Sequence, residues 1–183
     1  MERMFKAQDN VFYYLTIMNE NYEHPPMPVG IEDNIVKGMY LYRESEGASL
    51  QLMGSGAILR EVIAASEMLL SDFDIKSNIW SVTSFSELSR EGQECSRWNN
   101  LHPLETPRPS FVEKQLMHYG GPCIAATDYV RNHADQIREF VPNSYYVLGT
   151  DGFGRSDTRE SLRAYFEVNK YYIAITALSA LAK

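Results

Sequence analysis

Residues 144–166 read SYYVLGTDGFGRSDTRESLRAYF, which is a short apolar run, a glycine-rich loop and a polar stretch of helical character. The apolar run predicts a strand, and the stretch that follows Asp157 predicts a helix. Glycine-rich turns between a strand and a helix hold phosphate groups in many α/β proteins, because unpaired backbone N–H groups and the helix dipole point at the loop. The rest of the chain decides whether this loop can do the same.

The same succession of strand and helix recurs along the chain. Apolar and β-branched runs predict strands at residues 39–44, 49–54, 78–85, 122–127 and 144–149. Helices are predicted between and after them, at residues 31–38, 55–71, 86–97, 111–119, 129–140 and 170–181. Alternating strands and helices form a parallel sheet that helices cover on both faces.

The first two of these strands are separated by the residues SEGA and predict a hairpin over residues 39–54, which adds one antiparallel edge strand. The expected fold class is therefore α/β, a three-layer sandwich around a mostly parallel sheet of about five strands. Residues 98–110 contain three prolines and predict a long irregular connection through which no helix runs.

The start of the chain is organised differently. Residues 11–18, VFYYLTIM, are rich in β-branched and aromatic residues and predict a strand. A proline-rich linker follows to Gly30, so this strand has no partner nearby in the sequence. We expect residues 1–30 to be the end of a preceding domain with its linker, and residues 31–183 to be the domain described above.

Composition narrows the classes of partner. The 183 residues carry 17 Lys and Arg against 24 Asp and Glu, a net charge of −7, which argues against nucleic acid as a partner. Cys95 and Cys123 lie far apart without metal-ligand spacing, as in a reducing compartment, and we expect a cytoplasmic location. The longest apolar-rich run, residues 171–182, is shorter than the roughly 18 residues of a membrane span, and no membrane association is expected.

The loops at the carboxyl ends of parallel strands form the functional rim of such a sheet. Four loops are expected there, at residues 54–58, 83–87, 127–129 and 150–157. In the last of them the order Gly149, Gly152, Gly154 matches neither the dinucleotide fingerprint nor the P-loop. Asp157 and Glu160 predict a capping box that uses the donors an anion would need, and Asp151 and Asp157 would repel an anion. These features favour a structural turn, with a phosphate cradle as the alternative.

Catalytic signals are weak throughout. The four histidines, His24, His102, His118 and His133, are scattered, so a metal site is not expected. Neither cysteine is flanked by histidine, and Cys123 lies in an apolar strand where a thiol stays protonated. His102, in the proline-rich connection, is expected to tether that loop by a hydrogen bond. By themselves, the residues indicate an acidic α/β domain without a complete catalytic set.

Four stretches together are more specific than any of these motifs. They are VFYYLTIMNENYEHPPMP at 11–28, LMGSGAILREV at 52–62, SVTSFSELSREGQECSRWNNLHPLETPRPSF at 81–111 and LGTDGFGRSDTRESLRAYFEVN at 148–169. In this order they resemble, nearly residue for residue, the C-terminal part of the homodimeric, bacterial-type pyruvate dehydrogenase decarboxylating component, a member of the transketolase-like thiamine diphosphate enzymes. The resemblance covers practically the whole chain.

This resemblance implies a transketolase-like C-terminal domain at residues 31–183, preceded at 1–30 by the end of the family's middle domain. Family members are longer and decarboxylate pyruvate with thiamine diphosphate and Mg²⁺, then acetylate lipoyl groups of the dihydrolipoyl acetyltransferase component. The family's GDG cofactor motif is missing, because the nearest string is GTDG at 149–152. We therefore expect no catalytic, cofactor-binding or metal residue in this chain, which also stops inside the family's last helix.

The expected role is dimerisation and contact with the upstream domains, in an enzyme that is active only at full length. The candidate rim or interface residues are His102, Asp151, Gly152, Phe153, Gly154, Ser156 and Asp157. Phe153 would be an apolar anchor between glycines that let the backbone turn. An autonomous small-molecule binding or regulatory module of the same fold, such as a split-gene product, is the alternative, and an enzyme acting alone is disfavoured by the missing motifs.

Overall fold

The computed structural model describes residues 2–13, 15, 21–22 and 26–183. Within this part of the chain the strands form one five-stranded sheet in the order β1-β3-β2-β4-β5. The strands are β1 (Met39–Arg43), β2 (Leu50–Ser55), β3 (Ser77–Val82), β4 (Cys123–Ala126) and β5 (Tyr145–Leu148). Strands β2 to β5 run parallel and β1 is antiparallel to β3 at one edge, which confirms the expected fold class.

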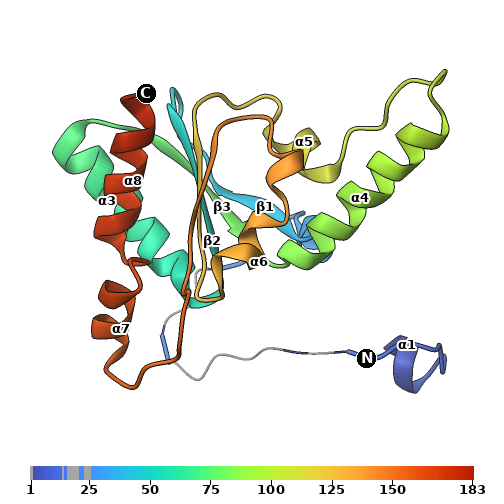
Figure 1. Ribbon diagram of the computed structural model, residues 1–183, viewed down its shortest axis with the longest axis horizontal. Helices are drawn as coiled ribbons and strands as arrows, with labels where there is room; N and C mark the ends of the chain where they lie inside the picture. Colours follow the sequence, from blue (N-terminus) through green and yellow to red (C-terminus); the bar gives the residue numbers. More distant parts are fainter. Residues whose placement is uncertain (1, 14, 16–20, 23–25) are drawn as a thin grey trace.

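Helices cover both faces of this sheet (Figure 1). One face is covered by α3 (Leu59–Phe73), which a 3-10 turn at Gly56–Ile58 precedes, and by α8 (Lys170–Leu181). The other face is covered by α4 (Phe85–Leu101), α5 (Phe111–Leu116) and α6 (Arg131–Asp135), with a further 3-10 turn at Arg138–Phe140. The remaining helices are α1 (Glu2–Phe5), α2 (Glu32–Lys37) and α7 (Arg159–Tyr165). The three-layer sandwich is thus confirmed.

The hairpin predicted over residues 39–54 is wrong. Strand β1 pairs with β3, where Met39 lies opposite Val82, and β2 lies on the other side of β3. The reason is burial: Leu50, Leu52 and Met53 are fully buried, so β2 needs helices on both faces and strands on both sides. The connection at 44–49 is long enough to cross the end of one strand, which is about 4.8 Å wide.

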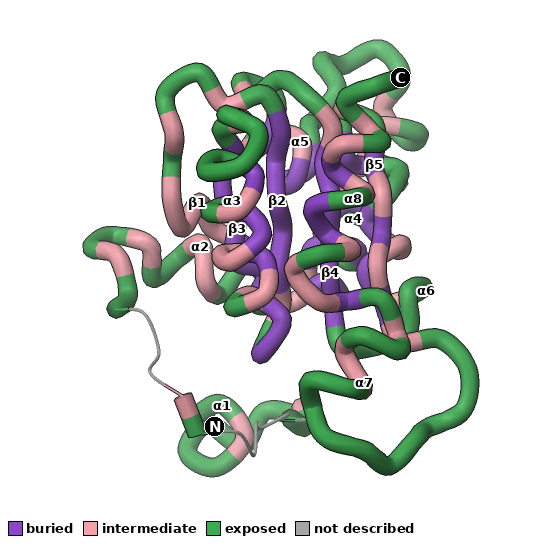
Figure 2. The backbone as a smooth tube through the Cα atoms, turned by 90° about the vertical axis from the view of Figure 1, so that its left-hand side faces the viewer, coloured by how far each residue is buried: buried purple, intermediate pink, exposed green. Residues whose placement is uncertain are grey.

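The central strands are buried along their length (Figure 2), and they include polar side chains. The amide oxygen of Gln51 accepts hydrogen bonds from Asn78 Nδ2 at 3.1 Å and from Trp80 Nε1 at 3.0 Å. The amide nitrogen of Gln51 donates to the carbonyl of Gly120 at 2.9 Å. Because each buried polar atom finds a partner, this cluster joins β2 to β3 without the cost of an unsatisfied group.

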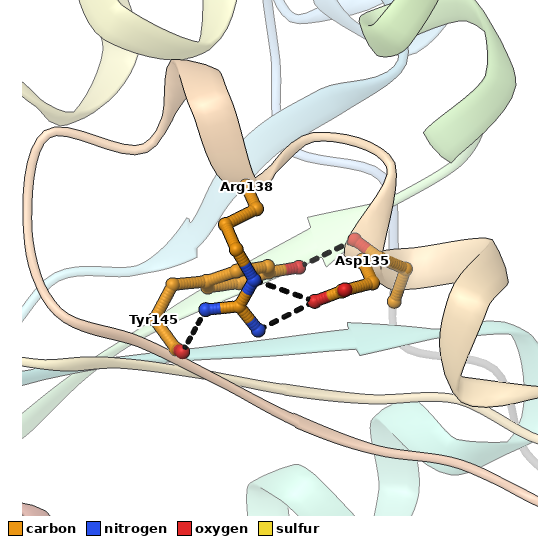
Figure 3. A network of polar contacts seen from close by, with 4 residues as sticks. Asp135, Arg138 and Tyr145 are labelled. Atoms are coloured by element: carbon orange, nitrogen blue, oxygen red, sulfur yellow. Dashed lines mark hydrogen bonds and ion pairs between the residues drawn. The ribbon is translucent and has the colours of Figure 1, made fainter.

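Arg138 secures the other edge of the sheet, at β5 (Figure 3). Its Nη1 donates to the main-chain carbonyl of Tyr145 at 2.7 Å, and its Nε donates to Asp135 Oδ1 at 2.8 Å. The Tyr145 hydroxyl in turn donates to the carbonyl of Ala134 at 2.9 Å. An edge strand exposes unpaired carbonyl groups, and this network occupies one of them.

Two further predictions need correction. Helix α4 continues to Leu101, so residues 98–101 of the predicted irregular connection are helical. The helix ends at Leu101, because Pro103 disfavours helical backbone in its predecessor, His102. In the strand predicted at 11–18, residues 11–13 and 15 form no strand, and the other positions lie outside the described residues. A strand needs a neighbouring strand, and the described part of the chain offers none there.

Candidate functional site

A cavity of about 1170 Å³ opens at the carboxyl edge of the sheet. All four loops that the sequence places on the rim contribute to its wall, which confirms that prediction. The segments that contribute are the turn between β2 and α3, the start of α4, the loop after β4, and the loop after β5 with α7. Figure 2 shows the exposed segment around α7 at this end of the molecule.

The turn after β2 is held tightly. A Cβ atom on Gly54 would lie 2.8 Å from the Cα of Leu59, so glycine lets the first turn of the helix pack against the end of the strand. Ser55 Oγ donates to Thr127 Oγ1 at 2.9 Å, and the same Thr127 oxygen accepts the N–H of Tyr129 at 3.2 Å. The loops after β2 and β4 are therefore tied together on the wall of the cavity.

The glycine-rich loop is anchored at its beginning. Thr150 donates through its N–H to the carbonyl of Tyr129 and through its hydroxyl to the carbonyl of Asp128, both at 2.8 Å. Asp151 Oδ1 accepts the N–H of Arg131 at 2.9 Å. A Cβ atom on Gly149 would lie 2.7 Å from that same nitrogen, so only glycine allows this approach. The loop thus starts from a fixed position beside the loop after β4.

The capping box predicted from Asp157 and Glu160 is wrong. Thr158 is the N-cap of α7, and its hydroxyl accepts the N–H of Ser161 at 3.2 Å. Asp157 lies one residue earlier, and its Oδ1 accepts the N–H of Thr158 at 2.6 Å. Asp151 and Asp157 therefore each accept a backbone N–H, and neither is among the residues that line the cavity. Neither carboxylate lines the cavity, but both keep their charge in the loop beside it and oppose an anion there.

Arginines dominate the charge of this wall. Among the described residues that line the cavity, four are arginines, Arg60, Arg155, Arg159 and Arg163, and Asp128 is the one carboxylate. The chain as a whole carries a net charge of −7. The cavity is thus a local basic site in an acidic protein.

Three of these arginines have defined neighbours. Arg163 Nη1 lies 3.4 Å from Glu61 Oε1, and the two side chains are only 15% and 18% exposed. Glu61 Oε2 also accepts the N–H of Lys170 at 3.0 Å, so one carboxylate joins α3, α7 and the start of α8. The guanidinium of Arg60 lies 4.8 Å from the ring centroid of Tyr22, and that of Arg155 lies 4.3 Å from the ring centroid of Tyr165. Both distances are within the range of cation–π contacts, which favour a fixed position of the guanidinium group.

Two titratable side chains, His133 in the cavity wall and Cys123 at the amino end of β4, have shifted pKa values. Burial lowers the pKa of His133, whose ring contacts Phe85 and Tyr129, while the charge of Asp128 acts in the opposite direction. The imidazole is therefore mostly neutral at pH 7. In β4, burial raises the pKa of the Cys123 thiol to about 12. The prediction of a buried, protonated Cys123 is confirmed, and this thiol is not a nucleophile at neutral pH.

The structure separates the sequence-predicted site residues. Gly152, Phe153 and Gly154 line the cavity, and Phe153 is 96% exposed. Asp151, Ser156 and Asp157 belong to the same loop outside the cavity lining. His102 lies at the far end of α4, on the opposite side of the molecule from α7 (Figure 1).

The His102 ring contacts its own helix, because its Nδ1 lies 2.8 Å from the carbonyl of Trp98 and its plane stacks on the Trp98 ring. The loop is tethered instead by Asn99, whose amide exchanges two hydrogen bonds with the backbone of Arg108 at 2.7 and 3.1 Å.

The arginines of the cavity are the residues that the sequence analysis missed. Arg159 and Arg163 are four residues apart in α7, a spacing that places side chains on one face of a helix, and Arg155 lies in the loop before it. This signal was present in the sequence. Arg60 carries no comparable signal, because its place follows only from how the turn after β2 packs.

Two family models match the chain. The model for the transketolase-like TK C-terminal domain matches residues 38–169, and the model for the pyruvate dehydrogenase E1 component middle domain matches residues 1–25. The pyruvate dehydrogenase E1 component of Cupriavidus necator is 57% identical over 186 residues, which cover 100% of this chain and 21% of the relative. That of Escherichia coli K12 is 52% identical over 187 residues, with the same 100% and 21% coverage. The chain spans about a fifth of the length of the curated relatives it matches.

Solved structures show the same fold at low identity. Transketolase from Campylobacter jejuni superposes with a TM-score of 0.54 at 18% identity, over 78% of this chain and 18% of that chain. Transketolase from Leishmania mexicana superposes with a TM-score of 0.55 at 15% identity, over 81% of this chain and 18% of that chain. A split-gene transketolase, described as an inactive tetramer of four beta subunits, superposes with a TM-score of 0.53 at 12% identity, over 80% of this chain and 43% of that chain. At these identities the likeness concerns the fold alone.

Proposed function

The chain belongs to the transketolase-like TK C-terminal domain family, and from this membership we propose that it forms the C-terminal domain of a pyruvate dehydrogenase E1 component. The observation that carries the proposal is the 57% identity with such a component over all of this chain. The proposed domain boundary lies after residue 30. Two family matches support this boundary, because the match to the middle-domain model ends at residue 25 and the match to the C-terminal-domain model begins at residue 38.

The activity proposed for the whole enzyme is decarboxylation of pyruvate with thiamine diphosphate and Mg²⁺, followed by acetylation of lipoyl groups on a dihydrolipoyl acetyltransferase component. We further propose a homodimer in the cytoplasm. The described residues of this chain do not fit the metal: no three His, Cys, Asp or Glu side chains among them gather to hold an ion, and the cavity has the single carboxylate Asp128. Mg²⁺ in proteins is bound through carboxylates, so we place its site in the upstream domains.

The proposed role of this domain is contact rather than chemistry. Among the described residues, the buried Cys123 is protonated. The imidazole of His133, in the cavity wall, is neutral and contacts the rings of Phe85 and Tyr129. Helix α4 and the loop after it offer a surface for a second subunit, because Leu101 and Leu104 are exposed there. This role also applies to the candidate interface residues Phe153 and His102.

A chimaera tests the proposal. The E. coli E1 component, with its own C-terminal domain replaced by residues 31–183 of this chain, is expected to reduce NAD⁺ with pyruvate in the reconstituted complex and to sediment as a dimer. The control is the same enzyme truncated before that domain, which should lose dimerisation. This chain alone should not decarboxylate pyruvate with thiamine diphosphate and Mg²⁺. Turnover by the chain alone, or a folded chimaera that stays monomeric and inactive, would refute the proposed role.

A further inference from the structure

The cavity at the carboxyl edge has properties that a contact surface does not require. Its volume of about 1170 Å³ is slightly above the usual range for small-molecule sites, roughly 300–1,000 Å³, so it has room for such a ligand. Its wall comes from loops that hydrogen bonds fix to one another, such as Ser55 to Thr127 and Thr150 to Asp128. We propose that this cavity binds a multiply charged, phosphorylated small molecule. The inference does not depend on the proposed function of the whole enzyme.

The charge of the wall is the first argument. Four arginines reach the cavity from two separate parts of the chain, the start of α3 and the segment from the glycine-rich loop through α7. The planar guanidinium matches phosphate oxygens with two parallel N–H donors. Asp128 is the one carboxylate among the described lining residues, so a ligand with several negative charges meets a net positive wall.

The orientation of the arginines is the second argument. Arg163 is held by Glu61, and the guanidinium groups of Arg60 and Arg155 lie over the rings of Tyr22 and Tyr165. A guanidinium has five N–H donors, so a partner at one nitrogen or on its face is compatible with a phosphate at another nitrogen. Side chains that are already ordered lose less conformational freedom when a ligand binds.

The glycine-rich loop supplies the third argument. Gly152 and Gly154 line the cavity, and a Cβ atom added to either would meet no atom within 4 Å. The backbone there is open, so a ligand can approach its N–H groups closely. The φ angle of Gly152 is +94°, a conformation that other residues rarely adopt. The two aspartates of the loop lie outside the cavity lining, so the arginines and the open loop backbone are the groups that a phosphate would meet there, as in the phosphate alternative.

The ligand is a small molecule rather than a polymer. A nucleic acid would extend beyond the cavity over a chain of net charge −7, which repels a phosphate backbone. The single carboxylate also argues against a ligand bound through a divalent metal, because such sites combine phosphate with protein carboxylates. The wall therefore suits phosphate groups recognised directly by arginine.

Calorimetric titration of this chain with inorganic pyrophosphate and with ATP, both without metal, tests the proposal. We expect both to bind, with a Kd below about 1 mM. The variant R155A/R159A should bind at least about tenfold more weakly, because it removes two cations that line the cavity. The matched control is R97A, which removes one exposed arginine of α4 outside the cavity and should change the Kd by less than about twofold.

Two results would overturn the proposal. One is the absence of binding by either probe at about 5 mM. The other is a change in log Kd for R97A that is half or more of the change for R155A/R159A, since general charge attraction would lower the affinity in proportion to the number of arginines removed. Hydrogen exchange of the unsubstituted chain gives an answer that does not depend on how the variants fold. Pyrophosphate should protect residues 54–60 and 149–163, and protection confined to other segments would contradict the site.

Discussion

Glu61 joins α3 to α7 and to the start of α8, and its replacement by alanine is expected to lower the free energy of unfolding by about 3 kcal/mol. The carboxylate accepts the Lys170 N–H at 3.0 Å, a charge-assisted hydrogen bond that contributes about 2 kcal/mol. It also lies 3.4 Å from Arg163. Removing the carboxylate leaves the guanidinium of Arg163, which is only 15% exposed, without this ion pair. Because some solvent still reaches the pair, we expect this loss to cost about 1 kcal/mol.

The assay is urea unfolding followed by circular dichroism, with E67A as the matched control. Glu67 lies on the same helix and pairs with Arg43 at 3.6 Å, but its side chain is 63% exposed. Exposed pairs contribute about 0.5 kcal/mol, so E67A should be almost neutral. Thermal unfolding should show a Tm lower by about 6–12 °C for E61A. Equal stability losses in E61A and E67A, within about 0.5 kcal/mol, would refute the reasoning.

A double-mutant cycle separates the two contacts of Glu61. If the pair with Arg163 matters, E61A/R163A should be less destabilised than the sum of E61A and R163A, with a coupling energy of about 1 kcal/mol. Zero coupling would assign the whole effect to the bond with Lys170. E61Q keeps an oxygen acceptor for that bond, and it should therefore retain more stability than E61A.

Two further predictions concern the core. A Cβ atom on Gly92 would lie 2.4 Å from the ring of Phe140, which is buried, so G92A should lower the free energy of unfolding in urea by about 1–3 kcal/mol. The control is G120A, whose Cβ would have no atom within 4 Å, and it should lower that free energy by less than about 1 kcal/mol. Because burial raises the pKa of Cys123 from 9.0 to about 12, its contribution to stability is fully present below pH 9 and is lost as pH rises toward 12. The free energy of unfolding should fall over that pH window, and C123A should show a smaller fall. In a separate measurement on the folded chain at pH 8, a thiol reagent should label Cys95 and leave Cys123 unreacted.

Local patterns predicted most of the elements, because each depends on residues close in sequence. The apolar spacing of α3 and the cap at Asn169 are of this kind, and the structure confirms both. The pairing of β1 with β3 is not of this kind, since it joins residues about 40 positions apart and depends on β2 being buried on both sides. The cap of α7 was misplaced by one residue because Asp157 and Thr158 are both good N-caps, and the backbone geometry decides between them.

The candidate site was harder to predict, because its charge is a property of the fold. The sequence gives a net charge of −7 and places two aspartates in the glycine-rich loop, and both facts argue against an anion. In the structure these aspartates accept hydrogen bonds from the backbone N–H groups of Arg131 and Thr158 and do not line the cavity. Arginines of α3 and α7 do line it. Net charge describes the long-range field of a protein, whereas binding depends on the groups that line the site, where four arginines face one carboxylate among the described lining residues.

The linker adds one more constraint on how this domain works within a longer chain. Among the described residues before Gly30, Tyr22 lines the cavity and lies against Arg60, so the wall includes a residue from the proposed inter-domain segment. The Tyr22 ring contacts the Arg60 guanidinium at 4.8 Å through its π face, while phosphate recognition uses the N–H groups of a guanidinium. The two contacts can therefore coexist on one arginine. A ligand in the cavity would stabilise the position of the linker, and the linker would in turn strengthen binding of the ligand, because such coupling acts equally in both directions.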